Sequence, residues 1–256
     1  MKIHTPSDSS LERYEYALKL ALTCPESLYD EVALTGSSAK GIADHTSDIE
    51  INFWGRTIPP ADQRVAWLAE NGVEEIVVIA QPRPDLSYWI SGVYRGIALE
   101  VGWQTVEALS DSLTTILNAN TIDHRALRLA DIVLSAVPLH GEGVLVDWQD
   151  RLSYDYSDVL QTRLIHDCFA KWGRGKYSDH KLILRAVFAL NRVWEVNWKR
   201  WEHELPKLNH LPPNFRARLG DANLIPLILD TLALIQALRS DLGGFIEAVK
   251  ARIQQG

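Results

Sequence analysis

The sequence predicts a mixed α/β fold, in which a small mixed sheet flanked by helices is followed by a C-terminal helical bundle domain. Alternation of polar and apolar residues predicts a half-buried strand at 48–54, and the other strands are expected between residues 31 and 103. Apolar residues at helical spacing dominate from residue 106 onward. The 256 residues, 46% hydrophobic and 23% charged, are enough for two domains of ordinary globular composition. We expect these domains at residues 1–147 and 148–256.

The N-terminal half is expected to begin with a helix over residues 9–23. Ser9 and Glu12 have the spacing of a capping box, and the apolar residues that follow have helical spacing. Pro59 and Pro60 predict the start of a second helix, which Asn71-Gly72 would end. The elements expected after the first helix are a strand at 31–35, a strand at 48–54, a helix at 59–70, and strands at 75–80 and 94–103.

The C-terminal half is expected to be helical apart from a short extended piece at 143–146. Amphipathic spacing predicts helices at 157–172, 181–201 and 224–253. Trp194, Trp198 and Trp201 would form one stripe on a helix. Such a stripe favours a core position over a wall for a nucleotide base.

Charge and cysteine content narrow the functional classes. A net charge of −7 argues against a nonspecific nucleic-acid binder. Cys24 and Cys168 match no metal-binding spacing and suggest reduced thiols. The polar N-terminus has no signal core, and the most apolar stretch, 224–238, is too short to span a bilayer. We expect a cytoplasmic protein without a membrane partner; a homodimer stays open.

The stretch from residue 34 to 51 carries the chemistry. On a strand, Asp48 and Glu50 share one face, because residues i and i+2 point to the same side. Two carboxylates roughly 6 Å apart repel by about 3 kcal/mol at an effective dielectric constant of 20, so a cation between them is expected. Hard oxygen ligands favour Mg²⁺, and two such ions about 3.5–4 Å apart suit an in-line phosphoryl displacement.

The glycine-serine pair before these carboxylates predicts an anion site. A strand that runs into Gly36 and Ser37 and then into a short helix exposes backbone N–H groups to a phosphate. Gly36 allows close approach, and the Ser37 hydroxyl adds a donor. Lys40 could supply a positive charge to the same phosphates.

Gly36-Ser37, ten further residues and then Asp48-Ile49-Glu50-Ile51 resemble the signature of the DNA polymerase β-like nucleotidyltransferase superfamily. The wider string resembles its small bacterial members, including the aminoglycoside and lincosamide nucleotidyltransferases. The resemblance covers about residues 30–105 and implies a third carboxylate on a later strand. Glu100 is the best match, with Glu107 and Asp85 as weaker candidates. A departure from the pattern is Glu50, where aspartate is commoner.

The resemblance implies magnesium-dependent transfer of a nucleoside monophosphate from an NTP, with ATP as the default donor, to a hydroxyl group. Asp48 and Glu50 would hold two Mg²⁺ ions, and Glu100 would complete the catalytic metal site and help to deprotonate the acceptor. Gly36, Ser37 and Lys40 would bind the nucleotide. An acidic chain favours a small-molecule acceptor such as a cationic aminoglycoside. Two alternatives stay open: an antitoxin-type adenylyltransferase that modifies a protein, and a catalytically silent nucleotide-binding protein.

Overall fold

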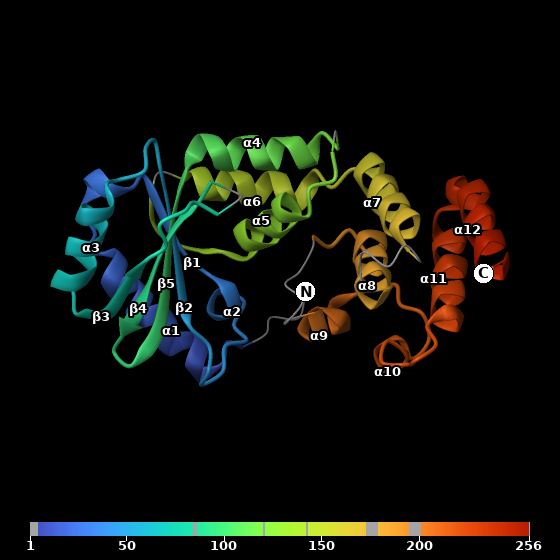
Figure 1. Ribbon diagram of the computed structural model, residues 1–256, viewed down its shortest axis with the longest axis horizontal. Coiled ribbons are helices and arrows are strands. Elements are labelled where there is room, and N and C mark those ends of the chain that lie inside the picture. The colour runs from blue at the N-terminus through green and yellow to red at the C-terminus, as the bar shows by residue number, and fades with distance from the viewer. Residues whose placement is uncertain are drawn as a thin grey trace. The chain divides into compact units, whose positions relative to one another are not determined.

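The computed structural model describes residues 5–83, 86–119, 121–141, 143–172, 179–194 and 201–255. The chain divides into two compact units, one made of Met1–Thr115 with Leu129–Asp155 and one made of Ile116–Arg128 with Tyr156–Gly256. We call them the α/β unit and the helical unit (Figure 1). The expected boundary after residue 147 falls inside helix α6 (Val144–Tyr154), and the division in the structure follows Asp155.

The α/β unit contains a six-stranded mixed sheet in the order β3-β4-β5-β2-β1-β6. β2 and β5 pair in parallel, and the other neighbours pair antiparallel. The predicted fold class, a mixed sheet flanked by helices, is confirmed (Figure 1). The strands are β1 (Glu31–Thr35), β2 (Ile49–Gly55), β3 (Val73–Val78), β4 (Tyr88–Tyr94), β5 (Ile97–Thr105) and β6 (Val137–Gly141).

Helices flank the sheet in the α/β unit, and the described part of the helical unit is mainly helical. None of those described is both long and apolar enough to cross a membrane. They are α1 (Asp8–Ala21), α2 (Gly36–Ala39), α3 (Ala61–Glu70), α4 (Val106–Leu117), α5 (His124–Ser135), α6 (Val144–Tyr154), α7 (Asp158–Lys171), α8 (Asp179–Leu190), α9 (Trp201–Glu204), α10 (Phe215–Arg218), α11 (Ile225–Leu238) and α12 (Gly243–Gln255).

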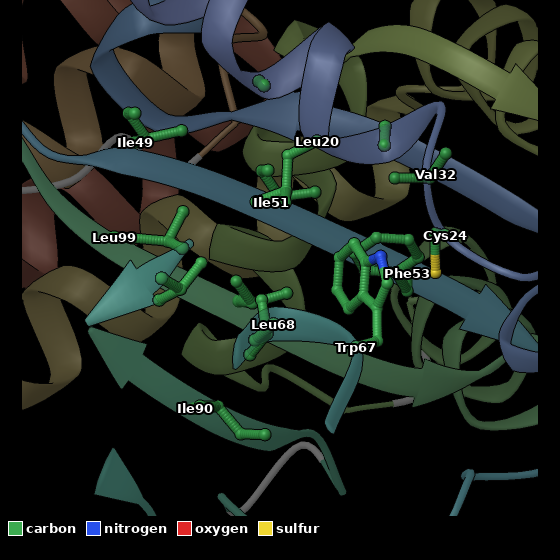
Figure 2. Close-up of a cluster of buried hydrophobic side chains, with 14 of the residues drawn as sticks. Leu20, Cys24, Val32, Ile49, Ile51, Phe53, Trp67, Leu68, Ile90 and Leu99 are labelled. Atoms are coloured by element: carbon green, nitrogen blue, oxygen red, sulfur yellow. The ribbon is translucent and has the colours of Figure 1, made fainter. Parts of the chain in front are cut away.

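The core of the α/β unit lies between one face of the sheet and helices α1 and α3 (Figure 2). Ile49, Ile51 and Phe53 alternate along β2 and are fully buried on this face. The Phe53 ring is stacked on Trp103 with centroids 5.2 Å apart and meets Trp67 edge-on at 5.4 Å. Because the alternate residues of β2 are buried here, the residues between them must face the opposite side of the sheet.

The first helix begins earlier than expected. Its N-cap is Ser7, whose hydroxyl accepts the backbone N–H of Ser10 at 3.1 Å, so the predicted capping box at Ser9 and Glu12 is wrong. Ser7 and Ser10 have the same spacing as Ser9 and Glu12, two residues earlier in the chain. The Ser10 side chain is buried.

Strand β4 lies in the stretch between residues 80 and 94, which was expected to be a turn region, and it forms a hairpin with β5. β4 and β5 are joined by Arg95 and Gly96, whose φ angles are 54° and 79°. A two-residue turn of this kind needs positive φ at both positions and is usually signalled by Asn-Gly or Asp-Gly. Arg-Gly lacks that signal, so β4 was missed.

The extended piece expected at 143–146 is also wrong, because α6 begins there. The carboxylate of Glu31, which is buried on β1, accepts the backbone N–H groups of Gly143 and Val144 at 3.0 and 2.9 Å. A carboxylate at this end satisfies the free N–H groups of the helix. The extended segment in this part of the chain is β6, which ends at Gly141 and pairs with β1.

Two long helices expected in the second half end early. α8 stops at Leu190, where the Asn191 amide donates to the Val187 carbonyl and Arg192 has a φ of 56°. Trp194 therefore lies beyond the helix, buried against the Tyr156 ring at 4.7 Å, and the helical tryptophan stripe is wrong. Trp198 lies outside the described residues.

The expected helix at 224–253 is interrupted as well. α11 and α12 are separate helices, with the 3₁₀ helix η4 (Ser240–Leu242) between them. Arg239 leaves the helical region of the backbone at the end of α11, and its guanidinium binds the Asp241 carboxylate at 2.7 Å. The glycine pair Gly243-Gly244, at the start of α12, was a usable signal for this break.

We expect truncation of a core side chain and of an exposed side chain to differ strongly in their effect on the free energy of unfolding. Phe53→Ala is expected to lower the free energy of unfolding by about 3–5 kcal/mol, because it removes a ring packed on three aromatic neighbours. Val77→Ala, at a side chain of the edge strand that is 58% exposed, is expected to change it by less than about 0.5 kcal/mol. Urea denaturation followed by circular dichroism measures both, and equal losses would contradict this packing.

Candidate active site

The face of the sheet opposite the core carries the predicted carboxylates. Glu50 on β2 stands in register with Glu100 on the parallel strand β5. Their neighbours along each strand are buried on the core side, so both side chains face the other way. Asp48 precedes β2 by one residue and is partly exposed, as are Glu50 and Glu100. Adjacent strands lie about 4.8 Å apart, which makes Glu50 and Glu100 lateral neighbours.

Glu50 also lies directly against the glycine at the start of α2. A Cβ atom placed on Gly36 would come within 2.3 Å of Glu50 Oε1 and 2.5 Å of its Cδ. Gly36 also has a φ of 69°, a left-handed conformation that favours glycine. The positive φ favours glycine here, and the close contact links the predicted phosphate turn to the predicted metal strand.

Ser37 supplies a buried hydroxyl donor. Its side chain is 6% exposed, and its Oγ has no hydrogen-bond partner among the residues that the structure describes. A buried hydroxyl left in this state costs free energy, so an outside acceptor would stabilise it. The adjacent Ser38 hydroxyl instead donates to the Asp48 carbonyl at 3.4 Å, which ties α2 to the start of β2.

Lys40 is engaged with a partner that the sequence did not suggest. Its Nζ lies 2.8 Å from both carboxylate oxygens of Asp131 on α5. The two side chains are only 11% and 15% exposed, so this ion pair is shielded from water. The prediction that Lys40 contacts a phosphate stays a prediction, and Asp131 would compete with that phosphate.

The third carboxylate is paired as well. Arg83 Nη2 lies 3.5 Å from Glu100 Oε2, and its guanidinium carbon is 3.9 Å from the centre of the Trp89 ring. Both members of this ion pair are about 40% exposed. Of the two weaker candidates, Glu107 is exposed in the first turn of α4, and Asp85 lies outside the described residues.

Two polar residues beside the carboxylates were missed. Asn52, next on the same face of β2 after Glu50, donates to the Thr35 hydroxyl at 2.6 Å. The same hydroxyl donates to the Glu50 carbonyl at 3.4 Å, so Thr35 joins β1 to the site. The period of two along β2 was a usable signal, because Asn52 follows Asp48 and Glu50 at the same spacing.

A divalent cation suits the donors present, although the carboxylates do not yet converge. Among the described residues, no three carboxylate, histidine or cysteine groups lie close enough to hold a metal ion. Asp48, Glu50 and Glu100 nevertheless offer only hard oxygen ligands. A phosphate next to Gly36 and Ser37 would meet the Glu50 carboxylate and be repelled by it. A cation between the two removes that repulsion, so the residues fit Mg²⁺.

Comparisons with known proteins give low similarity. No family model and no curated protein sequence matches the chain. Among solved structures, the chain is similar to the Cid1 poly(U) polymerase, with 18% identity and a TM-score of 0.32 over 51% of this chain and 42% of that one. It is also similar to a nucleotidyltransferase-like protein from Exiguobacterium sibiricum 255-15, with 16% identity and a TM-score of 0.31.

That second match covers 90% of this chain and 73% of the other. A third similar structure is the GLD-2/RNP-8 complex, with 15% identity, a TM-score of 0.32, and coverage of 90% of this chain and 78% of that chain. The alignments with Cid1 span less than half of that protein. At this similarity an activity and a substrate must be inferred from the residues of the site.

The contact between Gly36 and Glu50 can be tested with a matched pair of glycines. Gly72 has a φ of 79° and nothing within 4 Å of an added Cβ, so Gly72→Ala measures the backbone cost alone, about 1 kcal/mol. Gly36→Ala is expected to have a similar cost in the free energy of unfolding, because the Glu50 carboxylate can move aside.

Because Gly36→Ala displaces the Glu50 carboxylate, we expect this variant to bind Mn²⁺ in the presence of ATP about tenfold or more weakly. Gly72→Ala is expected to bind it as the wild type does. Urea denaturation and calorimetric titration measure the two quantities. Equal binding by the two variants would show that the position of Glu50 against Gly36 has no role in the site.

Proposed function

We propose that the chain is a nucleotidyltransferase that uses Mg²⁺ to transfer a nucleoside monophosphate from an NTP to a hydroxyl group. The observation that carries the proposal is the register of Glu50 with Glu100, on a face where Glu50 lies against Gly36. The same turn carries the buried Ser37 hydroxyl, for which the described residues offer no hydrogen-bond partner. Carboxylates next to a phosphate-binding turn require a cation, and a nucleoside triphosphate brings one.

Asp48, Glu50 and Glu100 are the residues that would hold the metal. Bound Mg²⁺ ions would supply charge neutralisation at the attacking and leaving oxygens of the phosphoryl transfer. Glu100 would exchange its contact with Arg83 for this role. The cost is small, because a half-exposed ion pair contributes at most about 1 kcal/mol.

The remaining steps belong to the protein's own groups. The Ser37 hydroxyl would donate a hydrogen bond to a phosphate oxygen, which satisfies its buried donor. Glu100 would accept the proton of the acceptor hydroxyl as its oxygen bonds to the α-phosphorus. The bond from that phosphorus to the bridging oxygen breaks, and pyrophosphate leaves with the electron pair. The proton passes from Glu100 to solvent.

We propose ATP as the donor, on the resemblance of the motif to the nucleotidyltransferases. The acceptor we propose is a small hydroxylated molecule. A cationic one such as an aminoglycoside would suit a chain of net charge −7 with carboxylates on the open face of its sheet. Cys24 and Cys168 are both buried and form no disulfide, which suits the reducing cytoplasm that we propose for this protein.

The test is transfer of label from ATP labelled at the α-phosphate, in Mg²⁺, to pooled aminoglycosides, lincosamides and other hydroxylated small molecules. Label on one pool would support the proposed acceptor class. Label on a protein after incubation with cell lysate would favour a protein-modifying enzyme. Nucleotide binding without any label transfer would favour a silent binding protein.

Neutral variants of the carboxylates are expected to lose transfer but keep the fold. Asp48→Asn, Glu50→Gln and Glu100→Gln should each lower the transfer rate at least about a hundredfold, because each removes a charge from the site. Glu74→Gln, on the exposed edge strand of the same sheet, is the control and should keep full activity. Circular dichroism would verify folding in each variant, and full activity of Glu100→Gln would remove Glu100 from the site.

A further inference from the structure

The loop that leads from α2 to Asp48 is attached along one face of α1. Ser7 donates its N–H to the Gly41 carbonyl at 3.1 Å and its hydroxyl to the Ala43 carbonyl at 2.7 Å. The Ala43 N–H donates to the Ser10 hydroxyl at 3.0 Å. Ser7, Ser10 and Arg13 follow one another at intervals of three, so they line the same side of the helix. The loop is therefore bonded to α1 at its start and its middle.

Arg13 makes the last of these attachments, immediately before the carboxylate. Its Nε donates to the Ser47 carbonyl at 2.8 Å, and Nη2 lies 3.4 Å from the His45 carbonyl. Nη1 donates to Ser9 within the helix at 3.0 Å. The side chain is 2% exposed, so a guanidinium has been removed from water to bind backbone carbonyls.

This burial needs an explanation, because a buried cation is costly unless its donors are satisfied. Three carbonyls accept from the guanidinium, and two of them belong to the loop. The nearest carboxylate is Glu12, 3.6 Å away and half exposed. The contacts of Arg13 thus serve mainly to hold backbone, and two of them hold the carbonyls of His45 and Ser47 in the turn that precedes Asp48.

We propose that Arg13 is a positioning residue for Asp48. The Ser47 carbonyl belongs to the peptide group that joins Ser47 to Asp48, so the hydrogen bond from Arg13 fixes the plane from which the Asp48 side chain starts. Metal ligands must be held within about 0.5 Å, and outer contacts that orient them typically change metal affinity 10–100-fold. The inference rests on the proposed function, because it assigns Asp48 as a metal ligand.

The planar fork of arginine is the feature that this role requires. It spans two carbonyls of the loop with separate N–H groups, whereas a lysine ammonium is a single point of charge on a flexible stem. Arg13→Lys keeps the charge and loses the fork. Arg56→Lys is the matched control, because Arg56 belongs to the same unit and its side chain is 83% exposed.

The experiment measures Mn²⁺ affinity in the presence of ATP by calorimetric titration, together with thermal unfolding without metal. Arg13→Lys is expected to weaken Mn²⁺ binding about tenfold or more, while Arg56→Lys binds as the wild type does. Hydrogen exchange of the backbone amides at 43–48 should become faster in Arg13→Lys only. Unchanged Mn²⁺ affinity in a folded Arg13→Lys protein would overturn the proposal.

A second variant covers the case in which Arg13→Lys fails to fold. Ser10→Ala removes the acceptor for the Ala43 N–H together with the 2.8 Å hydrogen bond to the Ser7 hydroxyl, at a position where alanine suits the helix. It should raise exchange at 43–48 and weaken Mn²⁺ binding about threefold, and wild-type behaviour in both measurements would overturn the proposal. If the wild-type protein binds no Mn²⁺, the proposed function is wrong, and hydrogen exchange still decides whether Arg13 holds the loop.

Discussion

Parallel pairing of β2 with β5 is the constraint on which the candidate site depends. Ile49 and Ile51 pack on one side of β2, and Leu99 and Val101 do so on β5. A slip of one residue would turn a strand's apolar side chains away from the core, so burial selects the register. That register leaves Glu50 beside Glu100 on the open face. The hydrophobic core thereby determines the spacing of the two carboxylates.

The segments next to β2 complete the arrangement at the start of this strand. The Glu50 carboxylate lies against Gly36, and α1 holds the loop that ends at Asp48 through hydrogen bonds. Residues that are distant in sequence thus meet around one strand end. The helix contributes through hydrogen bonds to the backbone of this loop, and in the proposed function these bonds would orient Asp48.

Charged groups near the site are paired within the protein. The Arg83–Glu100 pair is half exposed and contributes little, so a bound cation could replace it at low cost. The Lys40–Asp131 pair is more buried, and separating it would leave a shielded charge without its partner. Entry of a metal-bound nucleotide would therefore change the contact of Glu100 more readily than that of Lys40.

Elements with a strong local signal could be predicted from the sequence. The strand at 31–35 has the predicted bounds, and the helix at 158–171 differs from its prediction by one residue at each end. The β4–β5 hairpin was missed because Arg95-Gly96 adopts a turn that other dipeptides usually signal. The early end of α8 was missed because its apolar pattern continues past Leu190, where the Asn191 side chain and the positive φ of Arg192 stop the helix.

The sequence by itself determined that Glu50 lies on a strand after a Gly-Ser turn, and it predicted that Asp48 shares its face, because strand periodicity and glycine stereochemistry are local properties. It also singled out Glu100 as a charge within an apolar strand. Only the tertiary structure decided that Glu100 stands beside Glu50, that Lys40 pairs with Asp131, and that Arg13 reaches the Ser47 carbonyl. These contacts join segments as much as 91 residues apart, so chain packing rather than local pattern selects them.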